Sequence, residues 1–171
     1  MKKTEGIKKG KKAFLGAIDI GGTKIASAIF TFDGRPLFKS RVTVARAGGR
    51  SVLDQVLSLY FQLEAESQKR KGKLVAIGLG VPGVVNPENG QVWAPNIKGW
   101  KNFQLLKYLK KEINCLLSVV SDRTAYILGE AWKGAARGRR NVIYLAVGTG
   151  IGAGIMAEGK VVHGAGDLAG A

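Results

Sequence analysis

Two glycine-containing turns follow short apolar runs and have the composition of phosphate-binding loops. The first turn comes after Asp19 and contains Gly21, Gly22, Thr23 and Lys24. Glycines let backbone N–H groups approach an anion closely, while the threonine hydroxyl adds a donor and the lysine a positive charge. Alone, this stretch is also compatible with a plain Gly-Gly hairpin that Asp19 caps.

The second turn has alternating glycines and follows the apolar run 142–147. Its candidate phosphate-binding residues are Gly148, Thr149, Gly150 and Gly152. A strand that runs into such a turn leaves several N–H donors free for an anion. The alternative is a β-turn or bulge, but two loops of this kind at the ends of adjacent strands favour a phosphate site.

Two aspartates follow apolar runs and are candidates for the chemical step. Asp19 ends the run 13–18, where a carboxylate is costly unless it meets a cation or hydrogen-bond donors, and a nucleotide-bound Mg²⁺ would supply that partner. Asp122 comes directly after the run 116–120 and before a helical pattern. That position suits a general base that takes a proton from a substrate hydroxyl, although a helix N-cap would have the same sequence.

Two further residues are candidates for substrate contacts. Asn96 lies in the segment APNIKGW, and its side-chain amide can form hydrogen bonds with a substrate hydroxyl. The alternative is that Asn96 serves only as a turn residue. Gly83 ends the segment GLGVPG, which matches the GxGxxG pattern of dinucleotide-binding proteins. No helix pattern opens after Gly83, and a Rossmann unit requires one there, so the sequence argues against a dehydrogenase.

The elements that must position these residues alternate along the chain. Three β-rich runs come first, at 13–20, 24–32 and 37–45, followed by a helix with its N-cap at Ser51 and apolar positions at helical spacing. Strands at 74–79, 116–120 and 142–147 alternate with helices around 103–113 and 125–132, and a hairpin follows at 155–162. The order βββαβαβα predicts an α/β fold: a mixed five-stranded sheet with helices on both faces. Ligands in such sheets lie at the carboxyl ends of the strands. We therefore expect three segments to converge there: the turn 19–24, Ser121 with Asp122, and the turn 148–154.

Composition and charge limit the function classes. Of the 171 residues, 27 are Lys or Arg and 12 are Asp or Glu, which gives a net charge of +15. Six lysines fall within residues 1–12, predicting a flexible basic arm, and the remaining basic residues are scattered. This distribution argues against nucleic acid as the main partner but suits polyanionic small molecules such as nucleotides or polyphosphate. A single cysteine and no apolar run of membrane-spanning length predict a cytoplasmic protein without a membrane partner.

Taken together, the motifs resemble one family, the ROK sugar kinases of the actin/hexokinase superfamily. They occur in family order from 13 to 170: the turn 19–24, GLGVPG, APNIKGW, Asp122, LGEAW at 128–132 and LAVGTGIGAG at 145–154. The resemblance implies a ribonuclease-H-like (actin-like ATPase) domain and ATP-dependent phosphorylation of a hexose. The implied substrate is glucose, phosphorylated at its C6 hydroxyl.

The resemblance also implies roles for individual residues. Asp122 resembles the catalytic base, Asp19 the carboxylate associated with Mg²⁺, and the two glycine turns the loops that hold the phosphates of ATP. Gly83, Asn96 and Ser121 fall where the family lines its sugar pocket, together with Asp122. The family usually has Asn where this chain has Ser121, which is shorter and lacks the amide donor. No zinc ligands are expected in this stretch.

The resemblance ends at Ala171, where the family has a sugar-binding Glu. Beyond the basic arm at 1–12, which the lysines predict, the resemblance implies the N-terminal lobe of a two-lobe kinase at 13–171, with the second lobe absent. Such a lobe is expected to be weak or inactive alone, and a homodimer would cover the surface that its missing partner leaves bare. Two alternatives remain open: a degenerate, non-catalytic sugar-binding regulator, and a glucokinase that uses polyphosphate.

Overall fold

The computed structural model describes residues 12–148 and 151–171. The predicted basic arm, apart from Lys12, lies outside the described residues, as do Thr149 and Gly150. Lys12 is not part of an arm: it begins the first strand, where it pairs with Gly72.

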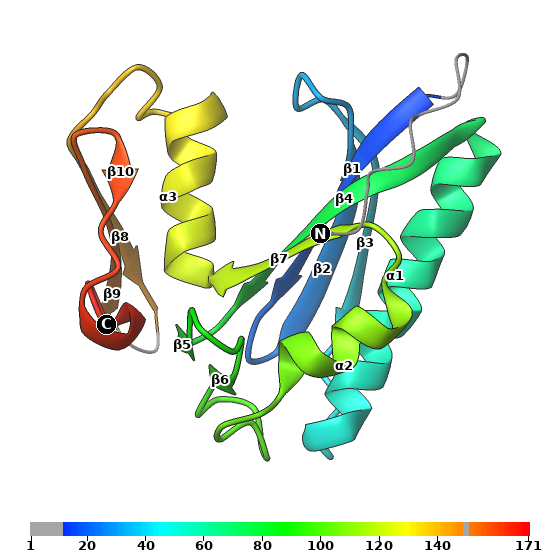
Figure 1. The fold of residues 1–171 in the computed structure, drawn as a ribbon, viewed down its shortest axis with the longest axis horizontal. Coiled ribbons are helices and arrows are strands. Elements are labelled where there is room, and N and C mark those ends of the chain that lie inside the picture. The colour runs from blue at the N-terminus through cyan, green and yellow to red at the C-terminus, as the bar shows by residue number, and fades with distance from the viewer. Residues whose placement is uncertain (1–11, 149–150) are drawn as a thin grey trace.

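A mixed five-stranded sheet forms the centre of the fold (Figure 1). Its strands, in chain order, are β1 (Lys12–Ile20), β2 (Lys24–Phe30), β3 (Pro36–Thr43), β4 (Gly72–Val81) and β7 (Leu116–Ser121). The spatial order is β3-β2-β1-β4-β7, with the first three strands antiparallel and β4 and β7 parallel to β1. The predicted α/β class and mixed sheet are therefore confirmed.

Two helices cover one face of this sheet, α1 (Gly49–Lys69) and α2 (Leu105–Glu112) (Figure 1). Every second residue of β1 points into that face, so Ile18 and Ile20 are buried there while Asp19 points to the opposite face. The core between sheet and helices is continuous; its largest fully buried side chains include Trp100 and Tyr60.

The third helix, α3 (Asp122–Lys133), lies on the opposite face, so helices cover both sides as expected. It touches that face at the strand ends: a Cβ built on Gly80, the register partner of Asp19, would lie 3.5 Å from the Cβ of Ala125. Beyond α3 this face stays open as a groove of about 490 Å³ along β1, β2 and β3, lined by Ala17, Ala28, Lys39 and Arg41 among others.

Several elements were not predicted. A short hairpin, β5 (Val84–Val85) with β6 (Val92–Trp93), lies between β4 and α2. The predicted strand 142–147 is confirmed as β8 (Val142–Val147), and the predicted hairpin 155–162 corresponds to β9 (Ile151–Ala157) and β10 (Lys160–Val161). The sequence did not predict that these strands form a separate three-stranded sheet in the order β10-β9-β8, or that the short helix η1 (Ala165–Asp167) follows it. The helix predicted with its N-cap at Ser51 begins at Gly49, with Gly48 as its N-cap. Gly48 has a φ of 66°, and a Cβ there would lie 2.3 Å from the carbonyl oxygen of Lys98. Over the described part of the chain, no helix has the length and apolar character needed to cross a membrane.

Candidate active site

The carboxyl ends of three parallel strands meet at one edge of the five-stranded sheet. Asp19 of β1 is in register with Gly80 of β4, and Gly80 with Val120 of β7, two residues before Asp122. A Cβ on Gly80 would lie 3.5 Å from Asp19 Oδ1 and 3.8 Å from the Cα of Asp122. The two aspartates that the sequence singled out are therefore neighbours, separated by a residue without a side chain.

Asp19 is a half-buried carboxylate with an uncharged hydrogen-bond partner. The hydroxyl of Tyr126 donates to it, with O···O distances of 3.2 Å to Oδ2 and 3.4 Å to Oδ1. Burial raises the pKa of Asp19, and the hydrogen bond from Tyr126 partly opposes that rise. Within the described residues, no lysine, arginine or histidine forms an ion pair with Asp19.

Asp122 is the first residue of α3 and is also half-buried. Its Oδ1 accepts the backbone N–H of Arg123 at 2.8 Å. Burial raises its pKa above the usual value for an aspartate; the contacts with Arg123 lower it, and the charge of Asp19 raises it further. A carboxylate with a raised pKa is a better proton acceptor, which is the property that a general base requires.

Ser121, and not Asp122, caps the helix. Its side chain accepts the backbone N–H of Thr124 at 3.4 Å, and its hydroxyl donates to Thr124 Oγ1 at 3.1 Å. Only 2% of Ser121 is exposed, so its hydroxyl is committed to the helix end. The capping alternative for Asp122 is therefore wrong, since the neighbouring residue takes that role and leaves the aspartate free.

The first glycine turn connects β1 to β2 and lies against the loop that carries Asn96. Gly21 donates its N–H to the carbonyl oxygen of Lys24 at 2.9 Å, which closes the turn. A Cβ on Gly22 would lie 3.3 Å from the Cβ of Asn96, so this glycine lets the two loops touch. Gly22, Thr23, Lys24 and Asn96 are all exposed, and this turn is open to a ligand.

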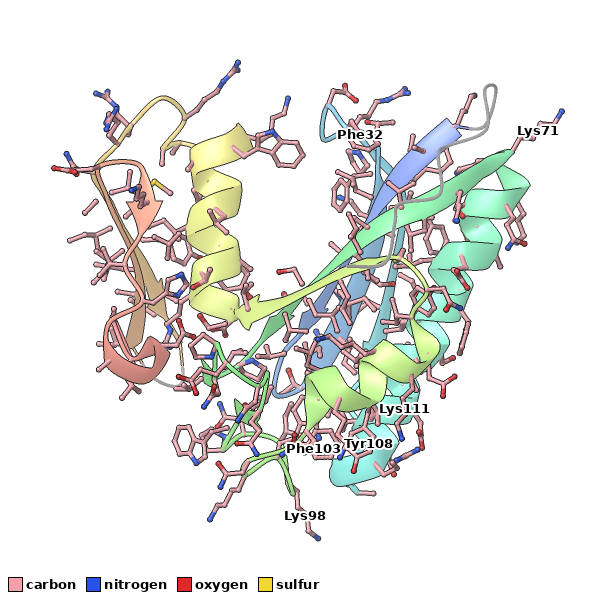
Figure 2. The ribbon with its side chains drawn as sticks, viewed as in Figure 1. Phe32, Lys71, Lys98, Phe103, Tyr108 and Lys111 are labelled. Carbon is pink, nitrogen blue, oxygen red and sulfur yellow. The ribbon has the colours of Figure 1, made fainter. Side chains whose placement is uncertain are left out.

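The Asn96 loop is held by aromatic packing beneath it. Trp100 is fully buried, donates its indole N–H to the Gly49 carbonyl at 3.0 Å, and stacks on Phe103 with ring centroids 4.9 Å apart. Tyr108 of α2 packs on the other side of Phe103, at 5.5 Å, and Figure 2 shows these two rings together below the sheet. This packing fixes the loop, while Lys98 points outward from it (Figure 2).

Gly83 occupies the turn between β4 and β5, where its φ of 99° favours glycine. A Cβ there would lie 2.2 Å from the Trp93 carbonyl oxygen. The carbonyl oxygen of Gly83 accepts a hydrogen bond from Arg123 Nη2 at 3.3 Å, and the same nitrogen donates to the Asp167 carbonyl at 3.3 Å. Arg123 thus ties this turn and η1 to the beginning of α3.

The second glycine segment reaches the site from the other sheet. Gly148 is exposed between β8 and β9, and Thr149 and Gly150 lie outside the described residues. A Cβ on Gly152 in β9 would lie 3.2 Å from Cδ of Arg123, so β9 passes beside the residue that follows Asp122. The expectation that both glycine turns follow neighbouring strands is wrong, since β8 belongs to the separate three-stranded sheet.

The donor atoms at the strand ends suit Mg²⁺. Asp19 and Asp122 present carboxylate oxygens, the ligands that this ion prefers. In the described ranges, no group of three or more His, Cys, Asp or Glu side chains is arranged to hold a metal. Mg²⁺ commonly keeps several waters and is held by one or two carboxylates together with substrate phosphates, so the site fits the ion in that manner.

Three residues of the site were not predicted from the sequence: Tyr126, Arg123 and Gly80. Tyr126 follows Asp122 by four residues, and this spacing on a helix places both side chains on one face. The sequence contains this spacing, but the spacing indicates a contact between Tyr126 and Asp19 only once the strands that neighbour β1 in the sheet are known.

The ROK family matches residues 15–171. A glucokinase from Halalkalibacterium halodurans is 35% identical over 155 residues, which cover 90% of this chain and 47% of that protein. A xylose repressor from Caldicellulosiruptor bescii is 33% identical over 159 residues, covering 90% of this chain and 39% of the repressor. The chain therefore spans about half, or less, of the length of these curated relatives.

Two solved structures extend the comparison. A ROK family glucokinase from Streptomyces griseus, in complex with glucose and AMPPNP, superposes with a TM-score of 0.79 at 28% identity, over 92% of this chain and 49% of that one. An inorganic polyphosphate/ATP-glucomannokinase from Arthrobacter sp. strain KM gives a TM-score of 0.77 at 29% identity, over 91% of this chain and 62% of that one. The family match extends from Leu15, within β1, to Ala171 and includes every described residue of the site. The chain belongs to the ROK family.

Proposed function

We propose that this chain is the lobe of a hexose kinase that holds the sugar and the phosphates of ATP, with glucose as the substrate and its C6 hydroxyl as the acceptor. The observation that carries the proposal is the pair of half-buried carboxylates, Asp19 and Asp122, at adjacent strand ends next to an exposed glycine turn and Asn96. Sugar kinases among the relatives, including one solved with glucose and AMPPNP, support this assignment.

In the proposed reaction Asp122 accepts the proton of the sugar hydroxyl. The hydroxyl oxygen attacks the terminal phosphorus of ATP, a new P–O bond to the sugar forms, and the bond to the bridging oxygen of ADP breaks. Asp122 needs no covalent intermediate for this role, because phosphoryl transfer depends mainly on positioning and charge stabilisation.

The remaining residues bind and orient the two substrates. Backbone N–H groups of the two glycine segments hold the phosphates, with Thr23 and Lys24 contributing a hydroxyl and a charge. Gly83 and Asn96 line the sugar side, and Ser121 fixes the beginning of α3 so that Asp122 faces the sugar. Asp19 would hold Mg²⁺ through its carboxylate, and the ion would supply positive charge to offset that of the donor phosphates.

The test is ADP release by the 171-residue chain with ATP, Mg²⁺ and a panel of hexoses. Asp122→Asn keeps the shape of the side chain but removes the base, and we expect a loss of at least about 100-fold in turnover. Asp54→Asn is the matched control, because Asp54 lies on α1 in an exposed pair with Arg50 at 3.7 Å. Equal turnover by Asp122→Asn and the unaltered chain would contradict the assigned base.

A regulatory function is the second candidate, favoured by the similarity to a xylose repressor. Saturable binding of a hexose without any binding of ATP, measured by calorimetry on the same preparation, would support it over the kinase, because a kinase lobe must also hold the donor phosphates. Polyphosphate is the alternative donor, suggested by the net charge of +15 and by the glucomannokinase. Phosphorylation with polyphosphate in place of ATP, weakened by added salt, would establish that donor.

A further inference from the structure

A tyrosine of α3 connects the candidate metal-binding carboxylate to the helix that carries the candidate base. The Tyr126 hydroxyl lies 3.2 Å and 3.4 Å from the two carboxylate oxygens of Asp19, and no other side chain of the described residues donates to Asp19. Tyr126 is one helical turn beyond Asp122, so the same stretch of α3 reaches both aspartates. None of the roles proposed above uses this hydroxyl.

The position of the tyrosine ring is fixed from the side of the second sheet. Tyr144 of β8 packs against it, with ring centroids 5.6 Å apart and an interplanar angle of 50°. On the opposite side, the Asp19 carboxylate lies beside Gly80, where a Cβ would be 3.5 Å from Oδ1, an ordinary van der Waals distance. Asp19 is thus held between the backbone of β4 and a tyrosine that is itself packed against β8.

The chemistry of the contact suits a metal ligand. An uncharged hydroxyl orients a carboxylate through a hydrogen bond while leaving its negative charge available. A lysine or arginine in the same place would neutralise Asp19 and compete with a cation for it. A carboxylate has about four lone-pair sites, so the contact with Tyr126 leaves others for the hydration shell of an ion.

We propose that Tyr126 is a positioning residue for Mg²⁺: its hydroxyl holds the Asp19 carboxylate in the orientation that binds the hydrated ion of the metal–nucleotide complex. The inference rests on the proposed function, because it takes Asp19 as the carboxylate that binds the ion. It adds a residue of α3 to the nucleotide side of the site and makes metal binding depend on the packing of α3 against β8.

The test compares Tyr126→Phe with Tyr144→Phe and Asp19→Asn by calorimetry, with Mn²⁺·ADP as the probe and with ADP plus EDTA as the metal-free reference. Tyr126→Phe removes only the hydroxyl, and we expect it to weaken binding of Mn²⁺·ADP about tenfold without changing the affinity for metal-free ADP. Tyr144→Phe removes the hydroxyl of the neighbouring ring and should leave both affinities unchanged. Asp19→Asn should abolish the difference between the two probes.

The outcomes separate this inference from the proposed function. Unchanged or tighter Mn²⁺·ADP binding by Tyr126→Phe, with Asp19→Asn still defective, would overturn the role of Tyr126 and leave Asp19 as the metal ligand. Equal losses with both probes would also overturn it, because they indicate a general structural effect. A third outcome is that the unaltered chain binds a hexose but shows no preference for Mn²⁺·ADP over ADP. That result would overturn both the metal-binding role of Asp19 and this inference, and it would leave the proposed sugar site supported.

Discussion

At the scale of single residues, burial of the two aspartates of the site lowers the stability of the folded state. Burial is the main cause of the raised pKa of both Asp19 and Asp122, and in the described residues neither has a cationic side chain in ion-pair contact. Enzymes place charges in such surroundings where the chemistry needs them and compensate elsewhere in the fold. Here the continuous core between the sheet and α1 supplies the compensation.

This cost predicts a pH-dependent gain in stability for Asp19→Asn. A carboxyl whose pKa is raised on folding favours the folded state least at neutral pH, where the folded protein must bury an ionised group, and the penalty disappears once the pH falls below the pKa of the unfolded chain. Asp19→Asn should therefore raise the thermal midpoint at pH 7 and leave it unchanged near pH 3. Thermal unfolding across this pH range, with Asp54→Asn as control, measures the effect; a lower midpoint at pH 7 would refute it.

At the scale of elements, the turn between β4 and β5 borders the candidate site on the side where we propose that the sugar binds. Gly83→Ala should destabilise the fold by about 3 kcal/mol, since the new Cβ would meet a carbonyl oxygen at 2.2 Å in a backbone conformation with positive φ. Gly138→Ala is the matched control: its φ is 77°, but a Cβ there has nothing within 4 Å, so only the backbone cost of about 1 kcal/mol is expected. Urea unfolding of both variants separates the clash from the dihedral strain. Equal losses would show that the contact with Trp93 is unimportant.

Long elements with a regular pattern were predictable, and their junctions were not. The sequence of β1 is an apolar run of strand length, and that of α1 has apolar positions at helical spacing, so both elements were predicted correctly and only their first residues were misplaced. β5 and β6 have two residues each, too few for any pattern, and they escaped detection. The run 142–147 reads as a strand in the sequence, but nothing in it tells which sheet the strand joins.

The candidate site, like the fold, could be predicted from the sequence only in part. Asp19, Asp122 and the first glycine turn were found because each combines a chemical group with a strand end. Tyr126 and Arg123 were missed because a helical tyrosine or arginine has no distinctive neighbours in sequence; their partners, Asp19 and the Gly83 carbonyl, lie 107 and 40 residues away. Such contacts depend on the sheet order.

At the scale of the whole molecule, the outer face of β8 is bare. Ile143, Leu145 and Val147 alternate along the strand and are 67%, 63% and 77% exposed, and β8 is an edge strand of its sheet. The intervening Tyr144 turns toward α3, where it packs on Tyr126. A row of apolar side chains on an unpaired edge is a surface that other chains can cover.

We therefore expect this chain to self-associate through β8 as its concentration rises. Replacing the three exposed residues together, as Ile143→Thr, Leu145→Thr and Val147→Thr, keeps a high strand propensity while removing most of the apolar surface. Sedimentation velocity over a range of concentrations should show association of the unaltered chain and a monomer for the triple variant. Phe32→Thr is the control, because Phe32 is 60% exposed but lies near the β2–β3 turn and not on β8, so this change should leave association unchanged. Association that survives the triple change would place the contact elsewhere and leave the open groove on the five-stranded sheet as the next surface to alter.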